Sequence, residues 1–438
     1  MRTTLSILTL VAMSSLLAAC GGEGRTRGPD TRVVAVHAAS SYPQILFMRE
    51  ERVASSLDFT GGAEVFFEVG QYDFNLEVVS PDSSQPVRVK SFSVTLERGT
   101  EYYFVITEVG GLLEPLIVTQ APFSPASTNV EASIVHAAPA SPTMDIYLAA
   151  PGAVLSAANP IGTAGFNQHI APNTFAPGDY QLSFTEAGNP LNVLFTSQTM
   201  AFIAGQSNSF VIADRGDDSN KVVVVRAANA ATAVLVDVNA PGALRVINAA
   251  TDVLPRDVFI DNDFAAPLLA GVPYAAPTAR APIAAGDRTI SVTPAGNPGV
   301  IEVEAITAIF PGGSYTGLVA GAPGALLLTV FPEDRRRVLG EAHLRYYNAA
   351  AQFTAINIFI ASAGSGPGFP LAMINGGAED EFPLPQGDYE ISVLPSGSTT
   401  LALGPLPITV ASEGLYSILF LNGPTADTAS VVLFDDFP

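Results

Sequence analysis

The chain has one cysteine, no tryptophan and four histidines in 438 residues. A single cysteine excludes a disulfide within the chain, so the fold must depend on buried apolar surface. Basic residues are also scarce, since 20 Lys and Arg stand against 41 Asp and Glu and the formal net charge is −21. This balance argues against nucleic-acid binding and against electrostatic docking on an anionic membrane, because both depend on Lys and Arg.

Apolar residues, glycine and proline are plentiful. Hydrophobic residues make up 48% of the chain, and 38 Gly and 34 Pro are spread through it. Short apolar runs between Gly and Pro turns are typical of β-strands, and they are too dense for a disordered chain. The length is that of several domains. The sequence therefore predicts an all-β, multidomain protein.

The N-terminal region has the pattern of an export signal. Met1-Arg2 is a short positive start, residues 5–17 are mostly apolar, and small residues follow. The apolar run is shorter than the roughly 20 residues of a membrane-spanning helix, which favours a cleaved secretory signal peptide at residues 1–19.

The end of this signal adds a second meaning. Leu17-Ala18-Ala19-Cys20 resembles the lipobox of bacterial lipoproteins. The resemblance implies that Cys20 is lipidated and becomes the first residue, with residues 20–30 as a polar tether. Several acyl chains make a stable membrane anchor. Gly21, in place of Asp, implies the outer membrane of the cell envelope. The alternative is an ordinary signal peptide with a chance cysteine.

Three landmarks recur four times in the same order. The first is a short strand ending in His or Asn followed by two alanines, and the second is a glycine turn into an alternating strand, usually Gly-x-Tyr. The first landmark occurs as Val36-His37-Ala38-Ala39, Val135-His136-Ala137-Ala138, Ile247-Asn248-Ala249-Ala250 and Tyr347-Asn348-Ala349-Ala350. The second begins at Gly70, Gly178, Gly286 and Gly387, with Arg288 replacing Tyr in the third copy. The third is another glycine turn before a strand.

These repeats predict four tandem antiparallel β-sandwiches of immunoglobulin-like type, because short strands between regular turns are typical of that architecture. The predicted domains are residues 31–121, 131–226, 243–332 and 342–438. The Gly-x-Tyr phrase is similar to the tyrosine corner of such sandwiches. A small β-barrel in each unit is the alternative. The short linkers predict a semi-extended row of domains whose stability is mostly local to each unit, with neighbour contacts added.

The second copy carries a further resemblance. Its Val135-His136-Ala137-Ala138-Pro139 phrase, the Asp145 strand and Pro177-Gly178-Asp179-Tyr180 resemble an uncharacterised bacterial envelope domain. That domain of unknown function occurs in tandem on secreted proteins and lipoproteins. The resemblance implies a β-sandwich and an envelope location, and it implies no catalytic residue.

The polar residues that invite a site also have structural interpretations. His37 and His136 share a position with Asn in the other copies, so we expect them to hydrogen-bond the backbone at a strand end. The segment at residues 214–218 contains Arg-Gly-Asp and further acids, and we expect a solvated hairpin tip. The acids at residues 379–381 and 435–436 are also expected to be solvated.

Familiar catalytic motifs of hydrolases, zinc proteases and nucleotide-binding enzymes are missing from the sequence. We therefore expect a non-enzymatic protein with no catalytic, cofactor-binding or metal-binding residue. The predicted function is a membrane-anchored envelope lipoprotein that acts as a structural spacer or adhesion module, with a protein or glycan partner. The alternative is an envelope ligand-binding protein, for a glycan or calcium, with one specialised repeat. A hydrolase with an unrecognised site is the third hypothesis.

Overall fold

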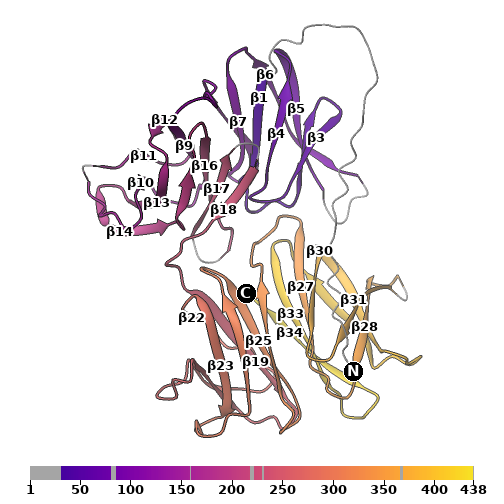
Figure 1. Ribbon diagram of the computed structural model, residues 1–438. Helices are drawn as coiled ribbons and strands as arrows, with labels where there is room; N and C mark the ends of the chain where they lie inside the picture. The colour runs from indigo at the N-terminus through magenta and orange to yellow at the C-terminus, as the bar shows by residue number, and fades with distance from the viewer. Residues whose placement is uncertain are drawn as a thin grey trace, which may run out of the picture.

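The computed structural model describes residues 31–79, 85–157, 159–217, 221–228, 231–365 and 368–437. All of its regular elements are β-strands, and they form four units (Figure 1). No helix in these ranges is long and apolar enough to cross a membrane. Cys20, the predicted signal peptide and the tether lie outside the described residues.

Each unit is a sandwich of an inner and an outer sheet. In unit 1 the inner sheet has the order β4-β1-β7-β8 and the outer sheet β3-β2-β5-β6. The strands are β1 (Thr31–His37), β2 (Ile45–Arg49), β3 (Arg52–Leu57), β4 (Gly62–Phe67), β5 (Gly70–Val78), β6 (Val87–Leu96), β7 (Glu101–Val109) and β8 (Leu112–Gln120). Alternate side chains of the two sheets meet in a core that includes Phe47, Phe74 and Phe104.

Unit 2 repeats this order with additions. Its inner sheet is β12-β9-β16-β17-β18, and its outer sheet is β11-β10-β13-β14, with β15 also pairing β13. The strands are β9 (Val130–His136), β10 (Met144–Ala149), β11 (Gly162–Ala164), β12 (His169–Phe175), β13 (Gly178–Glu186), β14 (Asn189–Thr196), β15 (Met200–Phe202), β16 (Ser207–Asp214), β17 (Val222–Ala228) and β18 (Ala231–Leu235). The additional strand β18 extends this sandwich beyond the predicted limit at residue 226.

Units 3 and 4 keep the arrangement of unit 1. Their inner sheets are β22-β19-β25-β26 and β30-β27-β33-β34, and their outer sheets are β21-β20-β23-β24 and β29-β28-β31-β32. Unit 3 contains β19 (Gly242–Ala250), β20 (Arg256–Ile260), β21 (Leu269–Val272), β22 (Ala281–Ile283), β23 (Gly286–Pro294), β24 (Val303–Ile309), β25 (Ser314–Gly321) and β26 (Leu327–Glu333). Unit 4 contains β27 (Glu341–Asn348), β28 (Ala355–Ser362), β29 (Phe369–Asn375), β30 (Glu379–Pro385), β31 (Gly387–Pro395), β32 (Leu403–Val410), β33 (Gly414–Asn422) and β34 (Ala429–Asp435).

The prediction of four tandem β-sandwiches is confirmed, with one difference in strand direction. The first strand of every unit pairs antiparallel with one neighbour and parallel with the other, as β1 does with β4 and β7. The parallel pairs in the later units are β9 with β16, β19 with β25 and β27 with β33. Each sandwich therefore contains a mixed inner sheet. A parallel pair needs a long connection between its two strands, and the strands of the outer sheet lie within that connection.

The units do not form a row of separate domains. Unit 1 docks on unit 2 and unit 3 on unit 4, inner sheet against inner sheet, so the chain forms two halves (Figure 1). The interface of the first half includes Val36, Val105 and Val211, and that of the second includes Ile247 and Leu419. The expected neighbour contacts are present, because these fully buried side chains lie between two units.

Two-sided burial explains why the inner strands lack alternation. In β1, Val33 and Ala35 face the core of unit 1, whereas Val34 and Val36 face unit 2. The strand is apolar at successive positions because both of its faces are covered. The outer sheets, with one face in solvent, keep the alternating pattern on which the prediction of sandwiches was based.

Candidate functional site

The repeated His or Asn at the end of each first strand holds a turn. His37 accepts from the amide of Ala39 at 3.3 Å through Nδ1, and its Nε2 lies 2.9 Å from the carbonyl of Pro43. Asn248 makes the equivalent contacts, accepting from Ala250 at 3.2 Å and donating to Leu254 at 2.8 Å. The expected backbone role is confirmed by these bonds, and burial lowers the pKa of His37 to about 4.

The Gly-x-Tyr phrase forms a corner in three units. Tyr72, Tyr180 and Tyr389 each donate to the carbonyl four residues earlier, at 2.9, 3.0 and 2.9 Å. In unit 3 the guanidinium of Arg288 reaches the same carbonyl position, that of Ala284, at 2.9 Å. The predicted tyrosine corner is confirmed, and arginine replaces its hydroxyl with a donor of similar reach.

The Arg-Gly-Asp segment is not a solvated hairpin tip. Arg215 and Asp217 pair with each other at 3.1 Å, and the Asp217 side chain is only 9% exposed. Gly216 has φ of 75° and lies so close to Ser40 of unit 1 that a Cβ there would meet the serine side chain at 2.6 Å. Its carbonyl accepts from the amide of Arg337 at 3.2 Å. The tripeptide is thus part of a junction between the two halves.

The most elaborate polar cluster lies between units 3 and 4 and is built on repeat-equivalent residues. Arg245 and Arg345 both stand three residues before the repeated Asn, on β19 and β27. Their parallel neighbours on the adjacent strands are Thr316 and Ser417. Because the two inner sheets face each other, both guanidinium groups point into one interface. We call this cluster the interface charge network.

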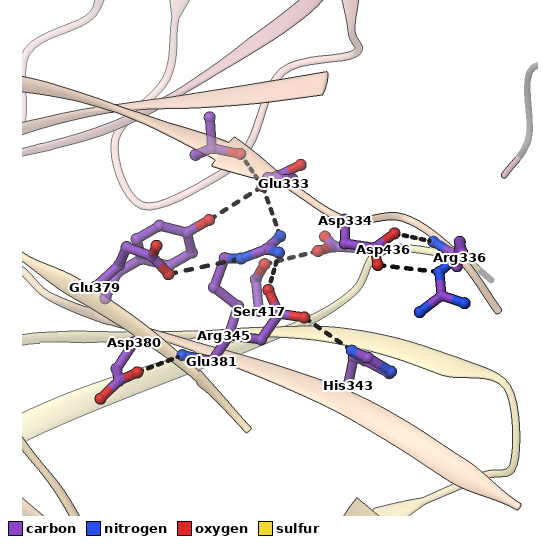
Figure 2. Close-up of polar contacts among 12 residues, drawn as sticks. Glu333, Asp334, Arg336, His343, Arg345, Glu379, Asp380, Glu381, Ser417 and Asp436 are labelled. Atoms are coloured by element: carbon purple, nitrogen blue, oxygen red, sulfur yellow. Dashed lines mark hydrogen bonds and ion pairs between the residues drawn. The ribbon is translucent and has the colours of Figure 1, made fainter. Parts of the chain in front are cut away.

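Glu333, the last residue of β26, lies at the centre of this network (Figure 2). Its side chain is fully buried and lies 3.0 Å from Arg245 and 3.0 Å from Arg345. Arg280 also pairs with it, and Tyr347 donates to it at 3.1 Å. Burial opposes ionisation of this carboxyl, but the surrounding guanidinium groups overcome it and lower its pKa to about 2.

Asp436 is the counterpart of Glu333 in unit 4. It accepts from Arg245 across the interface at 2.9 Å and from Ser417 of its own unit at 2.6 Å. Its side chain is 5% exposed. The prediction that residues 435–436 form solvated charge is wrong for Asp436, because docking of unit 3 covers this end of the strand.

The acids of β30 extend the network to the rim. Glu381 pairs with Arg345 and lies 2.8 Å from Nδ1 of His343 (Figure 2). Glu379 lies 3.6 Å from Nε of Arg345, and burial raises the pKa of its carboxyl to about 7. These two acids are partly buried ion-pair members, so the prediction that residues 379–381 are solvated is wrong for both.

The chemistry of the network suits attachment between units. Glu333 is ionised, is shared by three arginines and accepts bonds from hydroxyl groups, so its lone pairs are already engaged. Such a buried set favours one register of the two docked surfaces, because separating one member from its partners leaves an uncompensated buried charge. Across the described residues, no group of three His, Cys, Asp or Glu is arranged to hold a metal ion.

The segment after Glu333 joins the two halves. Arg336 stacks over the ring of Phe59 in unit 1 at 4.9 Å, and the amide of Leu339 donates to Ser41 at 2.7 Å. A cavity of about 490 Å³ lies beside this segment, with walls from units 1, 2 and 3. The sequence signalled a linker here, but not its docking on unit 1.

A comparison with curated proteins finds no match. Among solved structures, the Bacillus anthracis TIE protein is 11% identical with a TM-score of 0.15, covering 91% of this chain and 68% of that one. A variant of BcpA, the major pilin subunit of Bacillus cereus, is 11% identical with a TM-score of 0.13, covering 90% of this chain and 98% of that one. Both superpositions are loose.

A family model matches the chain twice. The matches cover residues 31–147 and 242–359, together more than half of the chain. Each begins at the first strand of a half and continues into the second unit of that half, as far as its second strand. The chain belongs to the family described as "Domain of unknown function (DUF4397)".

Proposed function

We propose that this protein is a lipid-anchored, non-catalytic component of the bacterial cell envelope that works as a rigid spacer and interaction module. The lipid on Cys20 holds the chain to a membrane, and Gly21 directly after it favours the outer membrane. The observation that carries the proposal is the interface charge network. It joins units 3 and 4 through buried ion pairs around Glu333, an arrangement that stiffens a pair of domains and leaves Glu333 no free lone pair for a reaction.

Rigidity is a useful property in a spacer. Inter-domain motion is the default for domains whose contact is small and polar. Here each half has an apolar interface of buried Val, Ile, Leu and Ala side chains, and the segment at residues 334–340 attaches one half to the other. The two halves would thus hold their outer sheets at fixed angles to each other.

Two experiments test this proposal. Metabolic labelling with a radioactive fatty acid and membrane fractionation should show lipid on the wild type and none on Cys20→Ser, which should leave the membrane fraction. Small-angle scattering on residues 21–438 should give a two-lobed particle shorter than four domains in a line. An unlabelled wild type, or a particle of four-domain length, contradicts the anchor or the rigid spacer, respectively.

A second candidate function is ligand binding, and the junction cavity favours it. Phe59, Arg215 and Asp217 line this cavity together with Arg336, so an apolar ring and charges of both signs meet there. The charged side chains are possible hydrogen-bond partners for a glycan, and the Phe59 ring, over which Arg336 stacks, adds an apolar wall. A glycan array on residues 21–438 and on Phe59→Ala tests it, and binding that Phe59→Ala leaves unchanged contradicts this location. A calcium titration of the melting temperature tests the cation alternative.

A further inference from the structure

Free sheet edges are a hazard in a protein made only of strands. An edge strand presents unpaired amide and carbonyl groups to any other extended chain, and natural proteins protect edges with proline, charge or a covering segment. The edge strands of this protein follow that rule closely. Proline occurs in β8, β12, β14, β22, β26, β29, β30 and β32. Charged side chains occur in β3, β4, β6 and β24.

β34 is an exception. Its residues Ala429 to Phe434 have neither proline nor charge, and Asp435 comes only at the end. In the part of the chain that the structure describes, β34 pairs with β33 on one side and has no strand on the other. The remaining unguarded edges are β11, β15 and β21, of three or four residues, and β18.

The equivalent strand in unit 2 shows how such an edge is covered. β17 also lacks proline, but β18 pairs antiparallel with it, placing Leu235 opposite Val224. β18 in turn lies against β4 of unit 1, where a Cβ on Gly62 would be 2.7 Å from Thr232. Under this cover Val224 is fully buried, whereas Val431, its counterpart in β34, is only partly buried.

The direction of the amide groups on β34 can be assigned. The amide of Asp436 donates to Leu415, and the carbonyl of Thr428 accepts from Gly423, so even-numbered residues face β33. Because successive residues alternate in a ladder, the amides of Val431, Leu433 and Asp435 point outwards.

The guarded edges support this assignment. Pro115 of β8 takes the position of Val431, and Pro332 of β26 takes that of Asp435. Proline at both places removes an outward amide without weakening the sheet.

We propose that the free edge of β34 receives one extended strand from a partner protein by β-strand addition. The partner segment resembles β18 in chemistry, because it is uncharged, carries small and apolar residues and runs antiparallel to β34. Main-chain hydrogen bonds give such a complex its affinity, and alternate side chains give it specificity. The proposal deepens the proposed function, on which it rests, by stating what the interaction module binds.

The donor is another protein, because the part of this chain that the structure describes offers no unpaired strand. Its described strands are already paired within their own units, and residues 21–30 are rich in glycine and charge. A second copy could offer its own β34 or another unguarded edge, but each of these edges belongs to a whole sandwich. In unit 2, however, the space between the edge of β17 and unit 1 holds a single strand, and a whole sandwich is far larger.

A peptide supplied in trans tests the proposal. The probe is a fluorescent synthetic peptide with residues 231–236, Ala-Thr-Ala-Val-Leu-Val, titrated into residues 21–438. We expect saturable binding that Val431→Pro weakens by about tenfold or more, since one outward donor is lost and a ring is placed in the ladder. Leu328→Pro, the same change at the equivalent position of the guarded strand β26, should leave the affinity unchanged. If Val431→Pro fails to fold by circular dichroism, Asp435→Pro replaces it.

Several outcomes overturn this proposal. They are an absence of saturable binding, equal binding by Val431→Pro, and a β34-dependent dimer that forms without peptide and disappears in Val431→Pro, which would make a second copy the occupant. Fatty-acid labelling and scattering do not involve the peptide, so the proposed function can fail while strand addition holds, and the reverse.

Discussion

Arg245 and Arg345 occupy the same repeat position in units 3 and 4, and each guanidinium lies 3.0 Å from the single carboxylate of Glu333. In units 1 and 2 the same position holds Val34 and Ser133. One docking geometry is therefore held by apolar contact in the first half, and by apolar contact together with buried charge in the second. The buried ion pairs around Glu333 make the second half more sensitive than the first half to substitution and to acid.

Glu333→Gln should destabilise the second half by about 3–5 kcal/mol, because three buried arginines lose their shared counter-charge. Chemical denaturation of residues 21–438 measures it as a lower midpoint of one transition. Asp334→Asn is the matched control. Its side chain is 51% exposed and pairs with the neighbouring Arg336, so a change below about 1 kcal/mol is expected. Equal effects of the two substitutions would show that Glu333 does not join the units.

His37 should make the stability of unit 1 sensitive to acid, and replacing it with Asn should remove that sensitivity. The pKa of His37 is lowered from 6.5 to about 4, so between these values the unfolded chain binds a proton that the folded chain does not. Stability from this residue is complete above pH 6.5 and is lost as the pH falls towards 4, by up to about 3 kcal/mol. His37→Asn copies Asn248, and its unfolding free energy should vary less across this range. A fold lost in His37→Asn at pH 7 would contradict the shared role.

The contribution of Glu379 to stability should have the opposite pH dependence to that of His37. Burial raises the pKa of its carboxyl to about 7, above its ordinary value of 4.5, so the folded state holds the proton more tightly. Its contribution to stability is present below pH 4.5 and is lost as the pH rises through 7. Glu379→Gln keeps the shape of the neutral form and should unfold at a higher denaturant concentration than the wild type at pH 8. The denaturation midpoints of the two proteins should agree at pH 4.5. A difference at both pH values would indicate a packing effect.

The repeats and turns of this fold were predictable because local chemistry determines them. A strand-end residue that both accepts and donates can be His or Asn, so His37 and Asn248 marked the same position in different units. The Gly-x-Tyr phrase predicted a corner because a hydroxyl must reach one carbonyl four residues back. These signals depend on residues that are neighbours in the sequence.

The docking of units was not predicted, although a signal for it exists. Val33 to Val36 and Val222 to Val225 are apolar at every position, a pattern that indicates burial on both faces of a strand. The interface charge network left no such signal. Arg245 and Asp436 are 191 residues apart, and each resembles a solvated charge until the partner sheet covers it.

Two neighbouring residues of β33 distinguish docking from folding. Ile418 faces the core of unit 4, whereas Leu419 faces unit 3, and both are almost completely buried. Leu419→Asp should separate the units, since an unpaired carboxylate would be buried in their interface, yet leave unit 4 folded. Scattering should show a larger radius of gyration with an unchanged far-ultraviolet β-sheet signal. Ile418→Asp places the same charge inside the sandwich and should reduce that signal. If Leu419→Asp also unfolds unit 4, then the sandwich depends on its partner for folding, and the two units of a half make a single folding unit.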